Sequence, residues 1–385
     1  MKYWRGYLVA VILAAITWAL TQFAQSHSIL VDMIYPYMAR LVVTSMAAWT
    51  GDMAFCLWQV LLIGMVAAGI VTVILMILLK WNFFQWLGWV LAAISCVITL
   101  NMAVYGLNQY ASPLADDVRL EINDYTVSEL NEATVFFRDK ANALALEIPR
   151  DSKGDPDFGT FEELAEKAGD GFRVLTYDQA VSVFAGSTVP VKKLGWSVFF
   201  GGQFGKTVAL TGEAAVNPNV PSAILPFAMC NEMAHRMSIY SDADAAFAAF
   251  LAGTANHSKA FQYSAYLMAY NYCYTALSQI PTSTAQSCAT QTDKGVNQKL
   301  RQDLESFEKF FGEAVAENNR AEIPEAAKNE NSPIRFSEYE NAADLLANWY
   351  IQTYIVPQHV EEEKPFNPLD PSQVDLTGLV NAKKK

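Results

Sequence analysis

Charge is nearly absent from the first 106 positions of the chain. Of the 66 charged side chains in the sequence, six fall there: Lys2, Arg5, Asp32, Arg40, Asp52 and Lys80. A 385-residue chain that is 52% hydrophobic, with its apolar excess at one end, is not an ordinary soluble protein. The apolar runs 3–23, 53–79 and 84–105 are each long enough to cross about 30 Å of hydrocarbon. The sequence therefore predicts a membrane region over 1–106 with three transmembrane helices.

The few basic residues of this region predict its orientation. Lys2 and Arg5 flank the first apolar run and Lys80 lies between the second and third, which puts the N-terminus in the cytoplasm. Three crossings then leave everything from Leu107 onward outside. The segment 25–50 is too polar to span and is expected to lie at the outer interface of the membrane. The alternative is that the first run is a cleaved signal peptide.

The part of the chain from residue 107 onward is acidic. It holds 37 of the 39 acidic and 23 of the 27 basic residues, which is a net charge of −14. Such a surface argues against a nucleic-acid partner and against docking on anionic lipid.

Cysteine is too scarce to form a disulfide scaffold. Two of the five cysteines, Cys56 and Cys96, fall inside predicted membrane spans. Of the others, Cys273 and Cys288 could pair, and Cys230 would then stay free or pair with another chain.

Residues 107–356 are expected to form one mostly helical domain, followed by a loosely ordered tail over 357–385. Helical spacing of apolar residues predicts helices over 127–146, 161–172, 243–251, 261–277, 297–316 and 337–355. The segment 189–216, rich in Gly, Val and Phe, predicts a small region of strand. Pro226 is expected in the first turn of the helix that follows this region. The fold class is therefore mainly α.

That helix carries the most informative motif. Residues Asn231 to His235 read Asn-Glu-Met-Ala-His, which is the zinc-protease motif His-Glu-x-x-His with asparagine in place of the first histidine. In the intact motif two histidines bind zinc and the glutamate activates a metal-bound water. Glu232 and His235 remain, but the amide of Asn231 is a poor zinc ligand. A buried glutamate and histidine on a helix can also simply pair with their neighbours.

A zinc site of this kind needs a third protein ligand, and Asp244 is the best candidate. It lies nine residues after His235, so a tight turn could return it to the metal. Ser241-x-x-Asp244 also resembles a capping box, so a helix cap is an equal alternative. His257 could substitute as a ligand, although its surroundings read as a polar turn.

A second motif resembles a phosphate-binding loop but departs from its spacing. Gly201 to Thr207 ends in the Gly-Lys-Thr of a phosphate-binding loop, but its first glycine is one residue too close. A phosphate loop must also open a helix, whereas 208–216 looks extended. Nucleotide binding is therefore not expected.

Several segments resemble one family of bacterial membrane proteins, classed as domain of unknown function 3810. The matching segments are 211–217 (Thr-Gly-Glu-Ala-Ala-Val-Asn), 225–227 (Leu-Pro-Phe), 231–235, 244–247 (Asp-Ala-Ala-Phe), 261–267 (Phe-Gln-Tyr-Ser-Ala-Tyr-Leu) and 337–346 (Ser-Glu-Tyr-Glu-Asn-Ala-Ala-Asp-Leu-Leu). The resemblance implies N-terminal spans, an outer zincin-like domain and a place in the bacterial plasma membrane.

The resemblance also implies roles for particular residues. Glu232 would be the general base, while His235 and Asp244 occupy ligand positions for zinc. Family members usually have histidine at the position of Asn231 and glutamate at that of Asp244, so two of the three ligand positions depart from the pattern. Glu213 or Tyr339 would line the site.

Three hypotheses for function follow. The first is a membrane-anchored pseudoenzyme of the metallopeptidase type that binds a peptide or protein outside the membrane without cutting it. The second is a working peptidase that uses Glu232 as base and zinc as cofactor at a weakened site. The third is a structural subunit of a membrane assembly, for which neither Glu232 nor its surroundings would matter.

Overall fold

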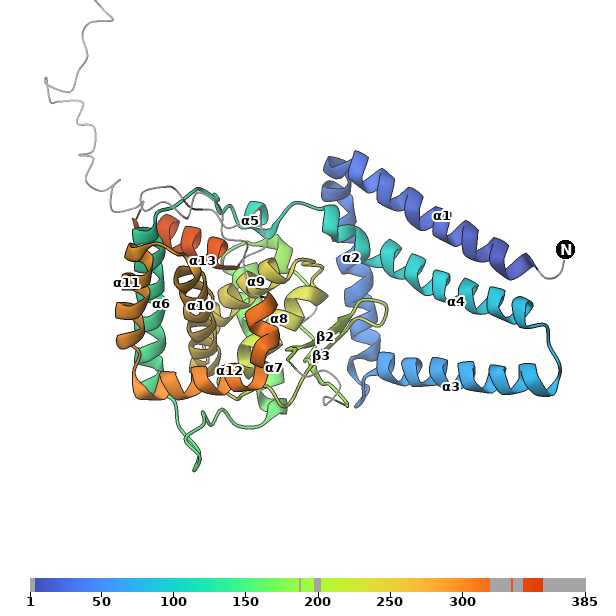
Figure 1. Cartoon of the computed structure of the whole chain (residues 1–385). Coiled ribbons are helices and arrows are strands. Elements are labelled where there is room, and N and C mark those ends of the chain that lie inside the picture. The colour runs from blue at the N-terminus through green and yellow to red at the C-terminus, as the bar shows by residue number, and fades with distance from the viewer. Residues whose placement is uncertain (1–3, 187, 197–201, 319–333, 335–341, 356–385) are drawn as a thin grey trace, which may run out of the picture.

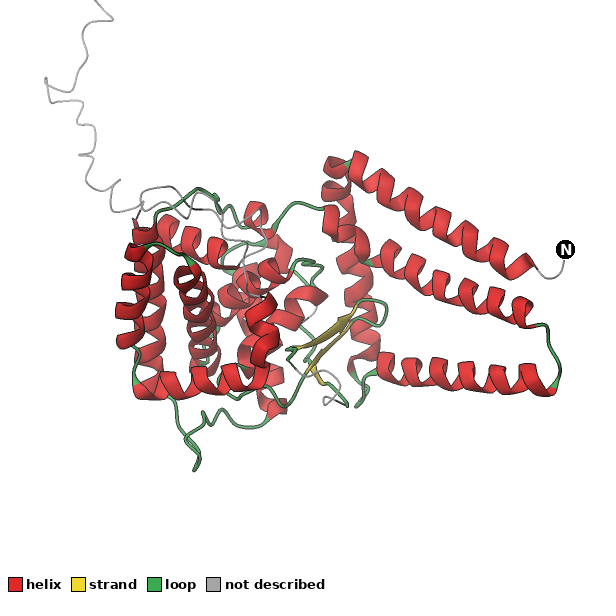
Figure 2. Ribbon diagram, viewed as in Figure 1, coloured by secondary structure: helices red, strands yellow, loops and turns green. Residues whose placement is uncertain are grey.

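The computed structural model of the chain describes residues 4–186, 188–196, 202–318, 334 and 342–355 (Figure 1). Helices dominate the described residues, and a few short strands lie near the middle of the molecule (Figure 2). The mainly α class with a small strand region is confirmed. The expected tail over 357–385 and Tyr339 lie outside the described residues.

Four N-terminal helices are long and apolar enough to cross a membrane. They are α1 (Arg5–Ser26), α2 (Ser28–Gly51), α3 (Leu57–Leu78) and α4 (Phe83–Val104). Three of them correspond to the runs predicted from the sequence, with ends shifted by a few residues. The fourth, α2, occupies the segment that looked too polar to span, because its two charges, Asp32 and Arg40, are too few to lower its hydropathy. By length and composition four helices could cross a membrane, so the predicted count of three spans is not confirmed.

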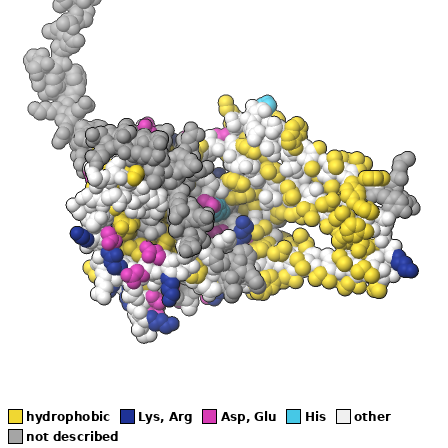
Figure 3. Space-filling model, in the orientation of Figure 1, with side chains coloured by type: hydrophobic (Ala, Val, Ile, Leu, Met, Phe, Trp, Pro, Cys, Tyr) yellow, Lys and Arg dark blue, Asp and Glu magenta, His cyan; other side chains and the backbone are white. Residues whose placement is uncertain are grey.

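The four helices do not form one bundle. Helices α1 and α4 pack tightly, since a Cβ on Gly6 would lie 2.4 Å from the carbonyl carbon of Gly88. Helix α3 stands apart and buries only Gln59. Helix α2 runs across the ends of the other three, between them and the rest of the chain (Figure 1). Hydrophobic side chains cover the part of the molecule formed by α1, α3 and α4 (Figure 3).

Helix α2 has a buried face and an apolar exposed face. The buried residues recur at helical spacing and include Ala39, Val43 and Ala47. Thr50 donates a hydrogen bond to the carbonyl of Thr211, and Gly212 packs so closely that a Cβ there would lie 2.2 Å from the Ala47 nitrogen. The exposed apolar residues are Ile29, Leu30, Met33, Ile34, Tyr37, Met38, Leu41, Val42 and Trp49.

The described residues after α4 are mostly helical. Their helices are the 3-10 helix η2 (Gly106–Tyr110), α5 (Leu114–Asp117), α6 (Val127–Glu147), α7 (Phe161–Tyr177), the 3-10 helix η3 (Ser182–Phe184), α8 (Leu225–Arg236), α9 (Asp242–Ala255), α10 (Lys259–Gln279), α11 (Ser283–Lys294), α12 (Gln298–Asn318), α13 (Ala342–Tyr350) and the π-helix η6 (Ile351–Ile355). The predicted helices are confirmed apart from the undescribed start of the last one. The polar helix α11 was not predicted.

Local signals explain where two of these helices begin. Thr126 and Thr160 each accept a hydrogen bond from the backbone of a glutamate three residues later, and that glutamate bonds back to the threonine nitrogen. These capping boxes satisfy amides that have no partner inside the helix. The first one begins α6 at Val127, where the helix predicted over 127–146 also begins.

The strands form one small sheet beside α8. Strands β1 (Lys192–Lys193), β2 (Gly205–Val208) and β3 (Glu213–Val216) have the order β1-β3-β2, with β1 parallel and β2 antiparallel to β3. All three lie inside the segment predicted to be extended. Because the Gly-Lys-Thr of residues 205–207 is strand and opens no helix, the structure agrees that it is not a phosphate loop.

The sheet is tied to the membrane helices by one buried ion pair. Glu213 accepts hydrogen bonds from the backbone nitrogens of Leu57 (2.8 Å) and Trp58 (3.0 Å), the first residues of α3. Its partner Lys192, 2.7 Å away, also donates to the carbonyls of Thr50 and Phe55. The anionic Glu213 therefore accepts from the free amides at the start of α3, and the cationic Lys192 donates to a free carbonyl at the end of α2. Each charge is of the sign that the helix dipole favours at that end.

The described cysteines are all free. Cys273 is buried and Cys288 partly buried, and no disulfide joins them. Cys56 lies just before α3, where its thiol donates to the carbonyl of Lys193. The prediction that Cys56 sits inside a membrane span is therefore wrong, because the helix begins four residues later than the apolar run.

Candidate functional site

Helix α8 carries the motif through the centre of the domain. Pro226 lies in its first turn as predicted, and Ser264 of α10 accepts a hydrogen bond from the Phe227 nitrogen. Asn231 and Glu232 are buried, with 7% and 5% of their surface exposed. The motif therefore lies in the packed interior and not on an open face.

Glu232 is held against strand β2. The hydroxyl of Thr207 donates to its Oε2 at 2.7 Å and lies 2.9 Å from its backbone carbonyl oxygen. Gly205 makes this approach possible, because a Cβ there would lie 2.9 Å from the Cγ of Glu232. Burial raises the pKa of the Glu232 carboxyl, although the nearby His235 and the Thr207 bond oppose the shift.

His235 is oriented by its own loop. Its Nδ1 lies 2.9 Å from the carbonyl oxygen of Ile239, which accepts a hydrogen bond when Nδ1 carries the proton. Its Nε2 is then the basic nitrogen and lies 3.5 Å from Oδ1 of Asp242. The carboxylate that approaches this imidazole is therefore Asp242, two residues before the one selected from the sequence.

Asp244 faces elsewhere. The Asp244 nitrogen donates to the Ser241 hydroxyl at 3.1 Å, so Ser241 is the N-cap of α9. Asp244 also lines a cavity against α2. Burial raises the pKa of Asp244 to about 6, and a hydrogen bond from the Leu114 backbone partly opposes this shift. The capping alternative is supported by this geometry.

The residues present do not fit a zinc ion. Over the described residues, no group of three or more His, Cys, Asp or Glu side chains is arranged to hold a metal. Asn231 offers an amide, and Asp244 lines a cavity against α2. Glu213, expected to line the site, accepts a hydrogen bond from the backbone at the start of α3. His257 is exposed in the bend between α9 and α10, where a polar turn was expected.

Two neighbours of the motif were missed by sequence reasoning. Thr207 lies on strand β2, 25 residues before Glu232 in the chain. The strand pairs with β3, which follows closely in the sequence, so the pairing pattern gives no sign of the contact with α8. Asp242 could have been found, since it lies seven residues after His235 at the start of the next helix. The capping pattern drew attention to Asp244 instead.

Replacing Glu232 by Gln is expected to stabilise the protein at neutral pH. The pKa of Glu232 is raised in the folded state, so the folded protein binds its proton more tightly than the unfolded chain, and the wild type loses stability as pH rises through that pKa. Glutamine keeps the acceptor for Thr207 without the buried charge. The melting temperature of the variant in detergent should be a few degrees higher at pH 8, and the difference should vanish near pH 4. The exposed Glu166→Gln change is the control and should have no effect; lower stability of Glu232→Gln at pH 8 would contradict the expectation.

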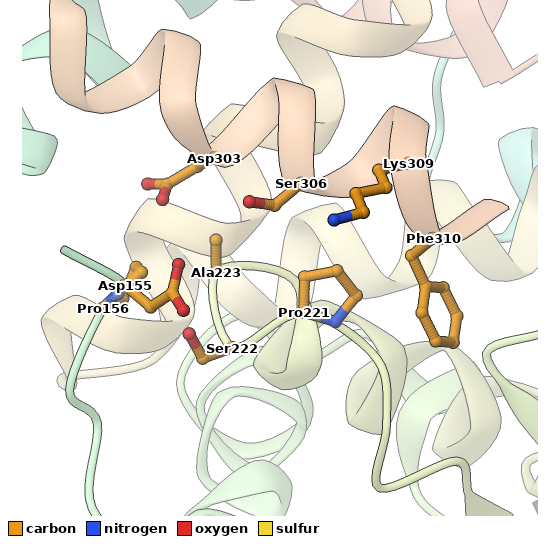
Figure 4. A pocket seen from close by; sticks show the side chains of 9 residues that line it. All are labelled: Asp155, Pro156, Pro221, Ser222, Ala223, Asp303, Ser306, Lys309 and Phe310. Carbon is orange, nitrogen blue, oxygen red and sulfur yellow. The ribbon is translucent and has the colours of Figure 1, made fainter. Parts of the chain in front are cut away.

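Two cavities accompany the site, and neither is lined by Glu232 or His235. One of 430 Å³ lies between α12 and the residues that precede α8; in Figure 4, Ser306 and Lys309 project from α12 toward Pro221 and Ser222. The other, of 740 Å³, lies between α2 and the domain and includes Asp244. We call the second one the interface cavity.

These features define a helical protein with an apolar N-terminal region and a buried Glu-His motif against a small sheet. A family model described as "Protein of unknown function (DUF3810)" matches residues 31–325, and the chain belongs to this family. The match includes α2 from residue 31 onward, the sheet and the motif. No curated protein and no solved structure matches the chain.

Proposed function

We propose that this protein is a membrane-anchored, peptidase-like binding protein that holds a peptide or protein segment outside the membrane without cleaving it. The observation that carries the proposal is the position of Glu232 beside an edge strand, without a set of metal ligands around it. The edge strand offers a surface on which an extended chain can pair. Without a bound metal, the adjacent Glu232 has no metal-bound water to deprotonate.

Strand β2 is the proposed docking edge. It pairs with β3 on one side, and no described strand pairs with its other side. Lys206 is exposed, and Thr207 on the same strand bonds to Glu232. An extended peptide could add to such an edge through main-chain hydrogen bonds. Its backbone would then run past the motif.

The membrane arrangement that we propose has three crossings. In this arrangement α1, α3 and α4 span the bilayer and α2 lies along its outer interface, since α2 runs across the ends of the other three (Figure 1). The apolar exposed face of α2 would dip into the headgroup region. The basic residues near the ends of α1 and α3 favour a cytoplasmic N-terminus, so the domain would be extracytoplasmic, as expected for a bacterial plasma-membrane protein.

A working zinc peptidase is the second candidate. The raised pKa of Glu232 favours it, because a general base works best when its pKa approaches the operating pH. The departures at Asn231 and Asp244 oppose it. Metal content separates the two candidates.

Elemental analysis of the purified full-length protein is the test. We expect less than about 0.1 zinc per chain in the wild type, because an amide and one imidazole do not form a zinc site. The Asn231→His variant restores two histidines one helical turn apart and should bind zinc. Near-stoichiometric zinc in the wild type, together with peptide hydrolysis that Glu232→Gln abolishes, would overturn the pseudoenzyme proposal.

The zinc gained by Asn231→His should depend on Asp242. This carboxylate is 3.5 Å from His235 Nε2, whereas Asp244 is turned toward the interface cavity. Adding Asp242→Asn to the variant should reduce its zinc affinity by at least about tenfold, while adding Asp244→Asn should leave it unchanged. Competition with a zinc-binding dye measures both. The opposite order would mean that Asp244 can reach the metal.

Docking on β2 is tested by hydrogen exchange. A mixture of extended ten-residue peptides should slow exchange of the amides of Gly205 and Thr207, which face away from β3, and the same peptides with N-methylated backbones should have no effect because they cannot pair with the strand. The amides of Lys206 and Val208 face β3 and are the internal control, so their exchange should not change when peptide is added.

A further inference from the structure

Few large hydrophobic side chains are exposed on the part of the chain that follows α4. Among the described residues they are Leu146, Tyr177, Trp196, Tyr240 and Tyr354. Single exposed hydrophobic residues are normal on a soluble domain. Trp196 and Tyr240 nevertheless share a position, because each lies beside one end of an apolar N-terminal helix.

The backbone that leads to Trp196 is fixed against the start of α3. Gln59, in the first turn of α3, donates from Nε2 to the carbonyl of Gly195 at 2.7 Å, and the Gly195 nitrogen donates back to Gln59 Oε1 at 3.1 Å. The thiol of Cys56 donates to the carbonyl of Lys193. Trp196 therefore follows a segment that the first turn of α3 holds in place.

The conformation of Trp196 is unusual for a bulky residue. Its φ is +49°, in the left-handed region that large side chains rarely adopt. Its side chain is still 52% exposed, so packing within the chain does not account for the position of the ring. A large ring in a strained conformation on the surface, next to an apolar helix, points to a contact outside the chain.

Tyr240 is fixed in the same way against the end of α4. Its ring centroid lies 5.6 Å from that of Tyr105, the residue that ends α4. The Tyr105 hydroxyl also donates to the carbonyl of Ile239 at 3.2 Å. Tyr240 is 42% exposed. The second exposed aromatic residue is therefore held beside the other apolar helix end that meets the domain.

Helix α2 sets the spacing of these two points. Tyr35 of α2 donates to the carbonyls of Met102 and Ala103 near the end of α4, whereas the carbonyl of Thr50 accepts from Lys192 of β1. Tyr35 and Thr50 are fifteen positions apart, which is about 22 Å along a helix. In the proposed membrane arrangement α2, the start of α3 and the end of α4 all lie at the outer interface. Trp196 and Tyr240 then lie near that interface at two separate points.

We infer that Trp196 and Tyr240 insert into the headgroup region of the outer leaflet and hold the domain against the bilayer at two points. Indole and phenol rings favour this region because each has an apolar body and a polar group. Two contacts about 22 Å apart restrict tilting of the domain over the membrane, which a single contact does not. This inference rests on the proposed position of α2 and goes beyond peptide binding.

The charges beside the two aromatic residues exclude attraction to anionic lipid as the cause of the contact. Lys193 is paired with Glu162, and the side chain of Asp242, two residues after Tyr240, is fully exposed. Insertion therefore depends on the apolar rings. It should occur on zwitterionic phosphatidylcholine and should persist at about 1 M salt, where interactions between exposed charges are screened.

Tryptophan fluorescence of the full-length protein in proteoliposomes tests the inference. The quencher is phosphatidylcholine with bromine near the headgroup end of its acyl chains. The signal of Trp196 is the difference between the wild type and Trp196→Phe, and Tyr240→Trp reports on the second point. Each signal should lose at least about half of its intensity in brominated lipid, because the ring lies at the interface.

Leu146→Trp is the matched control. Leu146 is 65% exposed near the end of α6, which lies on the side of the domain away from α1, α3 and α4 (Figure 1). Its signal should fall by less than about a tenth, because its side chain faces water. Trp89, 51% exposed in α4, is the positive control, measured as the difference between the wild type and Trp89→Phe.

The controls separate the possible failures. If Trp89 is quenched while positions 196 and 240 behave like position 146, the inference is overturned and the membrane arrangement stands. If Trp89 is not quenched either, the membrane arrangement fails and the inference fails with it. Quenching at 196 and 240 that needs anionic phosphatidylglycerol and disappears at about 1 M salt would also overturn the inference. Zinc content and peptide protection of β2 are measured in detergent, so they test the proposed function separately.

Discussion

Replacing Lys192 by Met is expected to lower the stability of the protein by about 3–5 kcal/mol, because it leaves the carboxylate of Glu213 buried without its counter-charge. The side chain of Glu213 has no exposed surface and that of Lys192 has 12%. The same change removes the donor that satisfies the carbonyls of Thr50 and Phe55. Thermal unfolding of the full-length protein in detergent measures the loss.

The neighbouring lysine is the control. Lys193 pairs with Glu162, but both side chains are at least half exposed, so Lys193→Met should cost no more than about 1 kcal/mol. The double change Lys192→Met with Glu213→Gln removes both charges and should recover part of the loss. Equal effects at the two lysines would contradict the idea that the buried pair joins the domain to α3.

The second large effect is expected at Gly212. Its φ is +66°, and a Cβ would lie 2.2 Å from the Ala47 nitrogen and 2.5 Å from the Val43 carbonyl oxygen, both of them backbone atoms of α2. Backbone cannot move aside as a side chain can. Gly212→Ala should therefore cost about 2–4 kcal/mol, from the left-handed conformation and the overpacking together. It should also expose the joint between α2 and the sheet to protease.

Gly64 provides the matched comparison. It lies in α3, and no atom would come within 4 Å of an added Cβ. Gly64→Ala should leave the melting temperature unchanged or slightly higher, because alanine is the better helix former. If Gly212→Ala were equally harmless, the close contact between α2 and the sheet would not contribute to stability.

Local patterns in the sequence were enough for the helices and their class. The apolar spacing of 127–146 and 261–277 and the position of Pro226 led to correct elements. The helix α2 itself was not predicted, because its polarity is intermediate and its one-sided burial depends on a domain that follows much later in the chain. Nothing local indicates that Val43 and Ala47 face the sheet.

At the candidate site, too, local patterns in the sequence predicted some features and could not predict others. The motif identified Glu232 and His235, and the structure puts them on one buried helix as its spacing predicts. Which carboxylate lies near His235 depends on the turn after α8, where Ser238 adopts a left-handed conformation. That turn brings Asp242 to the imidazole, whereas Asp244 lines the interface cavity. The role of Glu213 was likewise hidden, since its partners at the start of α3 lie 155 and 156 residues earlier.

This separation has a consequence for how the protein is made. In the proposed membrane arrangement, helix α3 can enter the bilayer long before Glu213 is synthesised. Until then the nitrogens of Leu57 and Trp58 have only water as partner, and the last carbonyl groups of α2 wait for Lys192. The start of α3 is therefore completed by Glu213, which is translated 156 residues after Leu57, in a chain that grows by roughly 5–20 residues per second. Insertion of α3 and folding of the sheet are thus two stages of one assembly, and the second completes the first.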